Sequence, residues 1–420
     1  GAGGGALKLV VKDDLVIDGL IRSNGNNGLS GGGSSGNYAS GGGSGGSIWI
    51  SAERIYGSGQ ITVNGGRGGN ATGSYNGGAG AGGRIALHYG EYIFNGTVTA
   101  FGGWGRVYGG AGTIYFSSKQ QLSGDLLIDN AGYSGGETRL SGTFENITIN
   151  NANSAVVFSR LTVRDTLLIN ASSFLSSAEI VAGTVDILRG TNTMNGKLVA
   201  QNIYLRPGSI VNHGQNTNNV SFTLDITADE MIIEQGATIN LNGRGYSSMY
   251  SSTLNGYGSG GGKGAGASST RSGGGAGHGG LGGNGYNGNG GGSTYGSLTG
   301  PAAIGSAGGG TYNVNRNGGA GGGAIKLTII GRLMLDGAIR ANGNTGSASG
   351  GSSSNYAAGG GSGGSIWIDT ISLAGTGEIS AIGGRGGNAA GSYNGGGGAG
   401  GRIAIKYADM NDWTGIENVT

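Results

Sequence analysis

The chain lacks cysteine, holds little proline and carries few charges, and these scarcities exclude several classes of protein. With no cysteine in 420 residues, it has neither a disulfide scaffold nor a thiolate metal site. Charged residues make up 11%, and 24 basic side chains nearly balance 22 acidic ones. That balance leaves no electrostatic footprint for nucleic acid or an anionic membrane. No run of about 18 apolar residues is present, so we expect no membrane insertion in this segment.

Glycine is the most abundant residue and occupies 105 of the 420 positions. Its usual share is about 7%. Composition alone therefore favours a disordered or fibrous chain. The order in which these glycines occur points to a folded repeat protein instead.

The sequence repeats over a long distance. Residues 1–89 match residues 319–407 without a gap, and the decapeptide GGGSGGSIWI stands at both 41–50 and 359–368. We divide the chain accordingly into a glycine-rich repeat copy (1–119), a stretch without long glycine tracts (120–235), a long glycine-rich tract (236–318) and the start of a second copy (319–420). We expect the first residue to continue a pattern that began before it, as in a segment of something longer.

A shorter unit recurs inside each copy. An alternating strand closes on Asn-Gly or Gly-Gly, as in GQITVNGGRGG (59–69), a glycine tract follows, and a second strand starts from glycines, as in GGRIALHY (82–89). No stretch keeps a helical period for three turns. Regularly spaced strands without crossover helices predict an all-β fold, a right-handed parallel β-helix solenoid with glycine-rich excursions from one corner. A β-sandwich is the alternative.

In this fold the alternating isoleucines and leucines enter a stacked core. The glycines carry the chain out of a coil and back, so successive excursions should lie side by side. If ordered, the excursions would adopt polyglycine II, with three residues per turn. In that case His278, Leu281, Asn284 and Asn287 would share one edge. The predicted core positions are Ile48, Ile50, Ile85, Leu87, Ile366, Ile368, Ile403 and Ile405.

These motifs resemble those of a known group of proteins. Corners such as NGGRGG (64–69) and return strands such as GGRIAIKY (400–407) look like the glycine-rich β-helical segments of very large bacterial surface and extracellular proteins. The solenoid core is similar to the pectin-lyase-like superfamily, and the glycine tracts resemble polyglycine II bundles. The resemblance implies an extracellular or cell-surface location. It extends to adhesins, matrix proteins and enzymes, so it does not select a function.

The sequence holds little that could perform chemistry. Carboxylates are sparse, and Asp225 and Asp229, which share a strand face, are best explained as surface solvation. The histidines are isolated, and His88 is replaced by Lys406 in the second copy. We therefore expect no catalytic residue, no cofactor and no metal. The leading hypothesis is a non-catalytic structural unit of a large extracellular protein or filament, which self-associates end to end or continues in the same chain. A glycan- or surface-binding adhesin comes second, and a polysaccharide-active β-helix enzyme third.

Two sets of residues are candidates for contact roles. Tyrosine in a Gly/Ser/Asn setting gives contact area at low entropic cost, although these rings could instead hold the tracts onto the solenoid. Arginines at the strand-to-tract corner could cap orphan carbonyls. The candidate contact residues are Tyr38, Tyr75, Tyr246, Tyr250, Tyr257, Tyr286, Tyr295, Tyr356 and Tyr393, and the candidate corner caps are Arg67, Arg244 and Arg385.

Overall fold

The protein is all-β in a computed structural model. Most strands belong to one long, mostly parallel sheet, as the alternating pattern predicted. The described part of the chain contains no helix, and so none that could cross a membrane. The structure describes residues 1–31, 38–72, 75–133, 135–150, 155–247, 254–266, 271–311, 317–348, 356–389, 393–409 and 412–420.

The chain forms two compact units, Gly1–Asn192 and Thr193–Thr420. The boundary falls inside the predicted segment 120–235, and the four-segment division stays a prediction. The strands that begin in the first unit are β1 (Ala6–Val10), β2 (Asp14–Val16), β3 (Leu20–Arg22), β4 (Ser47–Gly57), β5 (Gln60–Thr62), β6 (Arg84–Phe94), β7 (Thr97–Thr99), β8 (Thr113–Ser118), β9 (Asp125–Asp129), β10 (Thr138–Phe144), β11 (Ile147–Asn150), β12 (Ala155–Ser176) and β13 (Ile180–Met194). Those of the second unit are β14 (Leu198–Leu205), β15 (Ser209–Asn212), β16 (Leu224–Ile233), β17 (Thr238–Asn240), β18 (Ala324–Leu335), β19 (Ala338–Arg340), β20 (Ser365–Ala374), β21 (Glu378–Ser380), β22 (Arg402–Lys406) and β23 (Ile416–Asn418).

Neighbouring strands place similar residues directly opposite each other. In the first unit Ile48 of β4 faces Ile85 of β6, and Ile85 faces Ile114 of β8, all in parallel register. These side chains are buried, because alternation turns every second residue inward. Apart from the antiparallel pair β8–β9, every strand pair with a described register in either unit is parallel.

The predicted core is confirmed at six of its eight positions, which are Ile48, Ile50, Ile85, Leu87, Ile366 and Ile368. The other two, Ile403 and Ile405, are only partly buried. Both lie on β22, which among the described strands pairs with β20 alone. With a strand on one side only, their apolar faces stay half open.

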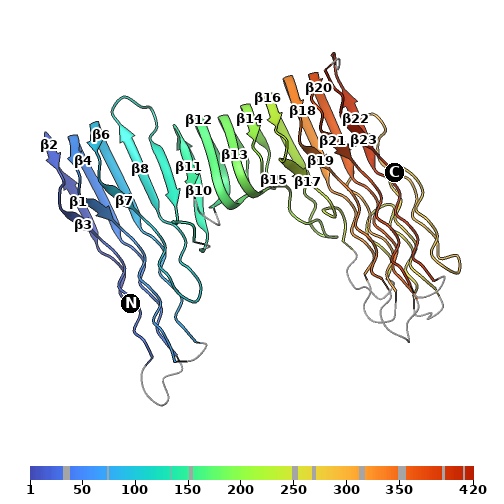
Figure 1. The fold of residues 1–420 in the computed structure, drawn as a ribbon, viewed down its shortest axis with the longest axis horizontal. Coiled ribbons are helices and arrows are strands. Elements are labelled where there is room, and N and C mark those ends of the chain that lie inside the picture. Colours follow the sequence, from blue (N-terminus) through green and yellow to red (C-terminus); the bar gives the residue numbers. More distant parts are fainter. Residues whose placement is uncertain are drawn as a thin grey trace. The chain divides into compact units, whose positions relative to one another are not determined.

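The glycine tracts are ordered by hydrogen bonds that recur every third residue. On the outgoing side of the first excursion, the N–H of Gly25 donates to Asn64 O, that of Gly28 to Arg67 O and that of Gly31 to Asn70 O, at 2.7–2.9 Å. Figure 1 shows these tracts of the first unit (blue) running side by side from one end of their strands.

In the returning tract, residues 39–46, the backbone N–H groups donate hydrogen bonds to two different neighbouring tracts. Gly42 and Gly45 donate to the next returning tract, whereas Gly43 and Gly46 donate to the outgoing tract of their own excursion. Three donors of successive residues therefore point in three directions, as in a chain with three residues per turn. The N–H groups in the third direction, those of Gly41 and Ser44, have no partner among the described residues.

In the second unit the long tract lies against the excursions. Gly273 and Ala276 donate to the returning tract 357–364. They accept in turn from Gly396 and Ala399 in the following returning tract. The tract thus forms an additional layer within the glycine-rich array, for which the first unit has no described counterpart.

Candidate contact surfaces and grooves

Two of the predicted contact tyrosines form an open pair in the first unit. Tyr38 and Tyr75 lie on adjacent excursions, with ring centroids 4.9 Å apart. They are 73% and 49% exposed. Each tyrosine lies at the start of its returning tract, so the two rings meet where adjacent tracts run side by side. A pair of exposed rings on a glycine background is a surface suited to contact.

The matching pair in the second unit is joined by a third ring. Tyr356 and Tyr393 lie 5.1 Å apart, and Tyr286 of the long tract packs edge-on against Tyr393 at 4.6 Å. Here the tyrosines hold one glycine layer on another. The same ring therefore serves as packing in one copy and is exposed in the other.

The remaining tyrosines lie within the second unit's array. Tyr246 and Tyr257 are half-buried. The hydroxyl of Tyr295 donates to Ile304 O at 2.6 Å, its ring stacks on His278, and burial raises the pKa of Tyr295 to about 12. Tyr250 lies outside the described residues. A contact role for all of these tyrosines stays a prediction.

The corner arginines do not reach the tract carbonyls that the structure describes. Arg67 and Arg385 are exposed, and Arg244 is half-buried, which lowers its pKa. Side-chain oxygens of the preceding outgoing tract instead cap N–H groups at this corner. Asn24 accepts from the N–H of Asn64, and Asn27 from that of Arg67, both at 2.8 Å.

A different arginine caps carbonyls of the long tract. Arg402 donates from Nε to Tyr295 O at 2.9 Å and from its terminal nitrogen to His278 O at 3.4 Å. This role of Arg402 was not among the predicted corner caps, because Arg402 opens a core strand. The signal was its place directly after the returning glycines, which leaves the side chain beside the tract.

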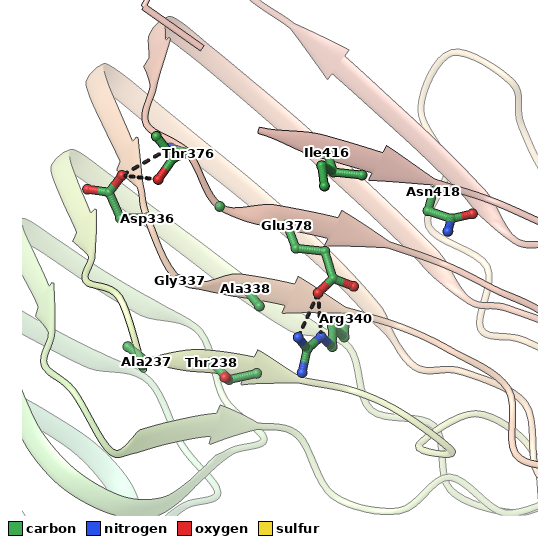
Figure 2. A pocket seen from close by; sticks show the side chains of 12 residues that line it. Ala237, Thr238, Asp336, Gly337, Ala338, Arg340, Thr376, Glu378, Ile416 and Asn418 are labelled. Carbon is green, nitrogen blue, oxygen red and sulfur yellow. Dashed lines mark hydrogen bonds and ion pairs between the residues drawn. The ribbon is translucent and has the colours of Figure 1, made fainter. Parts of the chain in front are cut away.

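An open groove of the second unit runs across the short strands β17, β19 and β21, with a volume of about 520 Å³ (Figure 2). Arg340 forms a salt bridge with Glu378 at 2.6 Å, and the Arg340 guanidinium lowers the pKa of Glu378. Asp336 accepts from the N–H and hydroxyl of Thr376. Both carboxylates thus accept hydrogen bonds, Glu378 between the paired strands β19 and β21, and Asp336 between the turns that precede these strands.

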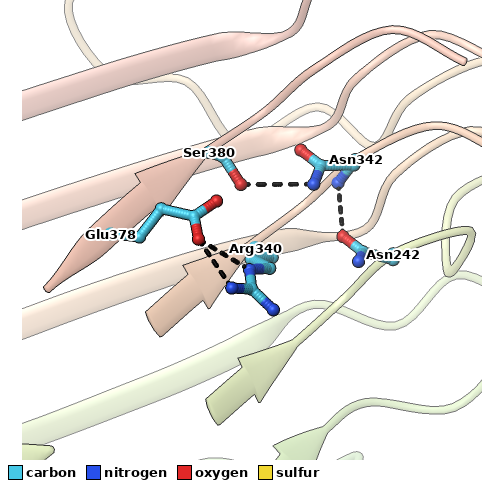
Figure 3. Close-up of polar contacts among 5 residues, drawn as sticks. All are labelled: Asn242, Arg340, Asn342, Glu378 and Ser380. Atoms are coloured by element: carbon cyan, nitrogen blue, oxygen red, sulfur yellow. Dashed lines mark hydrogen bonds and ion pairs between the residues drawn. The ribbon is translucent and has the colours of Figure 1, made fainter. Parts of the chain in front are cut away.

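Beside this groove, polar side chains connect β21 to the segments that follow β17 and β19 (Figure 3). The Asn342 N–H donates to Asn242 Oδ1 at 2.8 Å, and the Asn342 amide donates to Ser380 Oγ at 3.2 Å. Such asparagine contacts satisfy N–H groups where the chain leaves the sheet and enters the tract.

The first unit keeps one of the two groove carboxylates and lacks the other. Asp18 accepts from Ser58 there as Asp336 does from Thr376. At the position of Glu378, however, the first copy has Gln60. A carboxylate that one copy replaces with an amide is not required as an acid or base by the repeat. Within the described residues, no cluster of three or more His, Asp or Glu could hold a metal ion.

We expect Glu378→Gln to have little effect on stability. The salt bridge with Arg340 is about a third or more exposed on both sides, and such pairs contribute about 0–1 kcal/mol. The change in the free energy of unfolding, measured by denaturant titration, should stay below about 1 kcal/mol. A loss above about 2 kcal/mol would show that the groove is organised around this carboxylate.

His213 is a buried titratable group whose pKa is lowered to about 4, chiefly by desolvation. Its Nδ1–H donates to Gly214 O at 2.7 Å, and its Nε2 accepts from the N–H of Ala324 at 3.2 Å. The neutral ring satisfies both partners. Protonation would turn the acceptor into a second donor facing an N–H group.

Stability is therefore expected to fall with pH below neutrality. Because the pKa of His213 is near 6.5 in the unfolded chain, the unfolded state binds the proton first, and stability is lost as pH falls from about 6.5 to about 4. The loss between pH 7 and pH 4 is about 3 kcal/mol. In the matched control His213→Gln, the loss of stability between pH 7 and pH 4 should be smaller than in the parent by about 3 kcal/mol. An NMR titration that finds a His213 pKa above 6 would contradict this expectation.

No protein-family model, no curated protein and no solved structure matches the chain.

Proposed function

We propose that the chain is a non-catalytic structural unit of a large extracellular or cell-surface protein or filament. It is built as a right-handed parallel β-helix whose excursions pack as polyglycine II, and coils add to it end to end. The parallel registers, the three-residue hydrogen-bond period and the replacement of the groove residue Glu378 by Gln60 in the first copy support this proposal.

The observation that carries the proposal is the difference between β1 and its counterpart β18. β1 pairs with β4 on one side and has no described strand on the other. On the corresponding side of β18, the second unit places β16 in parallel register. Leu7 of β1 is accordingly 40% exposed, whereas its counterpart Ile325 is buried. A parallel edge with an apolar face is a template for another coil, which either a further part of the same chain or another molecule can supply.

The end-to-end proposal is tested with charges on the two end strands, Leu7 on β1 and Leu20 on β3, each of which has a described partner strand on one side only. In the double variant Leu7→Lys and Leu20→Lys, both side chains are at least 40% exposed in the parent, so the fold should be unchanged. The parent is expected to form linear particles with rising concentration in electron micrographs and light scattering. The variant should stay monomeric. Polymers that persist in the folded variant would place the joint elsewhere.

A glycan-binding adhesin is the second candidate, and the exposed pair Tyr38 and Tyr75 favours it. The parent would then bind to a glycan array while remaining a monomer. Tyr38→Ala with Tyr75→Ala should abolish that binding and leave the melting temperature unchanged. A parent that binds no glycan would remove this candidate.

A further inference from the structure

The returning tracts of the first unit keep one hydrogen-bonding edge open. The N–H groups of Gly41 and Ser44 on the first tract, and of Gly78 and Ala81 on the next, have no partner among the described residues. They recur every third residue, and Gly41, Ser44, Gly78 and Ala81 are all exposed. This edge is defined here as the open edge.

The second copy uses the same edge. Gly359, the counterpart of Gly41, donates to Gly309 O at 2.9 Å, and Ser362 donates to Ser306 O at 3.0 Å. Gly396, the counterpart of Gly78, donates to Gly273 O at 2.9 Å. The open edge is therefore a row of N–H donors that can bind a glycine-rich strand. In the second copy the long tract occupies the same edge.

Side chains at the base of the edge repeat the pattern. In the second unit Ser365 donates to Ala303 O at 2.6 Å, and Arg402 donates to Tyr295 O at 2.9 Å. Their counterparts Ser47 and Arg84 are exposed in the first unit. A groove of about 410 Å³ lies there, and it is lined by Ser44, Ser47, Ala81 and Arg84 among others.

We propose that the open edge of the first unit binds a glycine-rich strand of the chemistry of residues 271–292, supplied by another molecule. The strand donates to and accepts from the returning tracts every third residue, and Arg84 caps its carbonyls. A tyrosine of the strand rests on Tyr38 and Tyr75, as Tyr286 does on their counterparts. This lateral surface is separate from the end faces of the proposed function.

The space around single glycines of the returning tracts agrees with a glycine-rich strand bound at the open edge. A methyl group on Gly78 would meet no atom within 4 Å, whereas on Gly396 it would lie 2.0 Å from Gly283 O. The atoms that would meet the methyl group on Gly396 belong to Gly283 and Gly275 of the long tract, which covers this edge in the second unit. Ala79 has a methyl already, and its counterpart Gly397 has open space even when covered. The first copy thus leaves room where the strand would run.

The test titrates a synthetic peptide of residues 271–292 into the full chain, whose second unit is already filled by its own tract. We expect saturable binding and slower amide exchange at Gly78 and Ala81. A longer peptide of residues 271–311 should protect Gly41 and Ser44 as well, because Ser306 and Gly309 belong to its added part.

Gly78→Ala provides the selective block. It should leave melting unchanged and weaken peptide binding at least tenfold. Gly19→Ala, at an open and exposed glycine outside the tracts, is the matched control and should change neither quantity. In the peptide, Gly275→Ala should also abolish binding, because the corresponding methyl group lies 1.9 Å from Gly397 O in the second unit.

Three results would overturn the proposal. They are no protection of Gly78 and Ala81 at millimolar peptide, equal binding by Gly78→Ala, or self-association of the chain that protects these amides without peptide. The last would mean that a second copy covers the edge. The Leu7→Lys and Leu20→Lys variant separates the two proposals, since it blocks the end face and should bind peptide like the parent.

Discussion

Replacing Ile48 with aspartate is expected to lower the free energy of unfolding of the first unit by at least about 4 kcal/mol. Ile48 is 2% exposed and lies between Leu7 and Ile85 of the neighbouring parallel strands. No cation is among these stacked neighbours, so the carboxylate would lose its hydration without gaining a partner. The loss adds to that of the isoleucine contacts, which alone cost about 2–5 kcal/mol.

Ile93→Asp is the matched control for this substitution. Ile93 lies on β6, next to β4, and is 49% exposed. It should change stability by less than about 1 kcal/mol. Both variants are compared with the parent by thermal and denaturant unfolding followed by circular dichroism. Equal melting of Ile48→Asp and the parent would show that this strand does not contribute to the core.

The strand pattern was predictable because it is local physics. Alternation of Ile, Leu or Val with polar residues fixes which face turns inward, and the recurrence of SIWI-type strands after glycines fixes which strands are equivalent. Ile48, Ile85 and Ile366 could therefore be assigned to the core before the structure was known. The partial burial of Ile403 could not, since it depends on how many strands surround β22.

The path of the long tract was not predictable from spacing. An every-third-residue pattern suggested that His278 and Leu281 share an edge, which is wrong. His278 is buried against Gly363 and Tyr295, whereas Leu281 is exposed, because the chain turns between them and the His278 N–H bonds to Gly280 O. A three-residue period holds only while the tract stays straight, and glycine allows it to turn anywhere.

The contact residues were predictable in type and only partly in place. Tyrosines in glycine tracts do gather, as Tyr38 and Tyr75 show. Which pairs stay open depends on whether another tract covers them, and this is a property of the array rather than of the local sequence. Arg402 shows the same limit, because its partners lie more than a hundred residues away in the chain.

Substituting alanine for Gly43 or Gly45 is expected to destabilise the first unit, although both residues belong to a segment that composition alone would make a flexible linker. A methyl group on Gly43 would lie 1.9 Å from Ala2 O, and one on Gly45 would lie 1.9 Å from Val63 O. Both obstacles are backbone atoms of hydrogen-bonded neighbours and cannot turn away. Overpacking of this kind costs about 1–3 kcal/mol.

Gly41→Ala on the same tract is the control. The nearest atom to its added methyl group is Gly78 O at 3.4 Å, an ordinary contact, so we expect no loss of stability. In a floppy linker all three substitutions would be neutral or would stabilise the protein by about 0.4–1 kcal/mol, because alanine restricts the unfolded chain. The two pictures therefore predict opposite signs at Gly43 and Gly45.

Amide exchange in the parent supplies an independent measurement of the same array. Gly42, Gly43, Gly45 and Gly46 donate hydrogen bonds within it, so their exchange should be slow. Gly41 and Ser44 should exchange fast, which gives a protection pattern with a period of three residues. Uniformly fast exchange across residues 41–46, together with unchanged melting of Gly43→Ala and Gly45→Ala, would mean that the tract does not form the hydrogen-bonded layer on which the open edge depends.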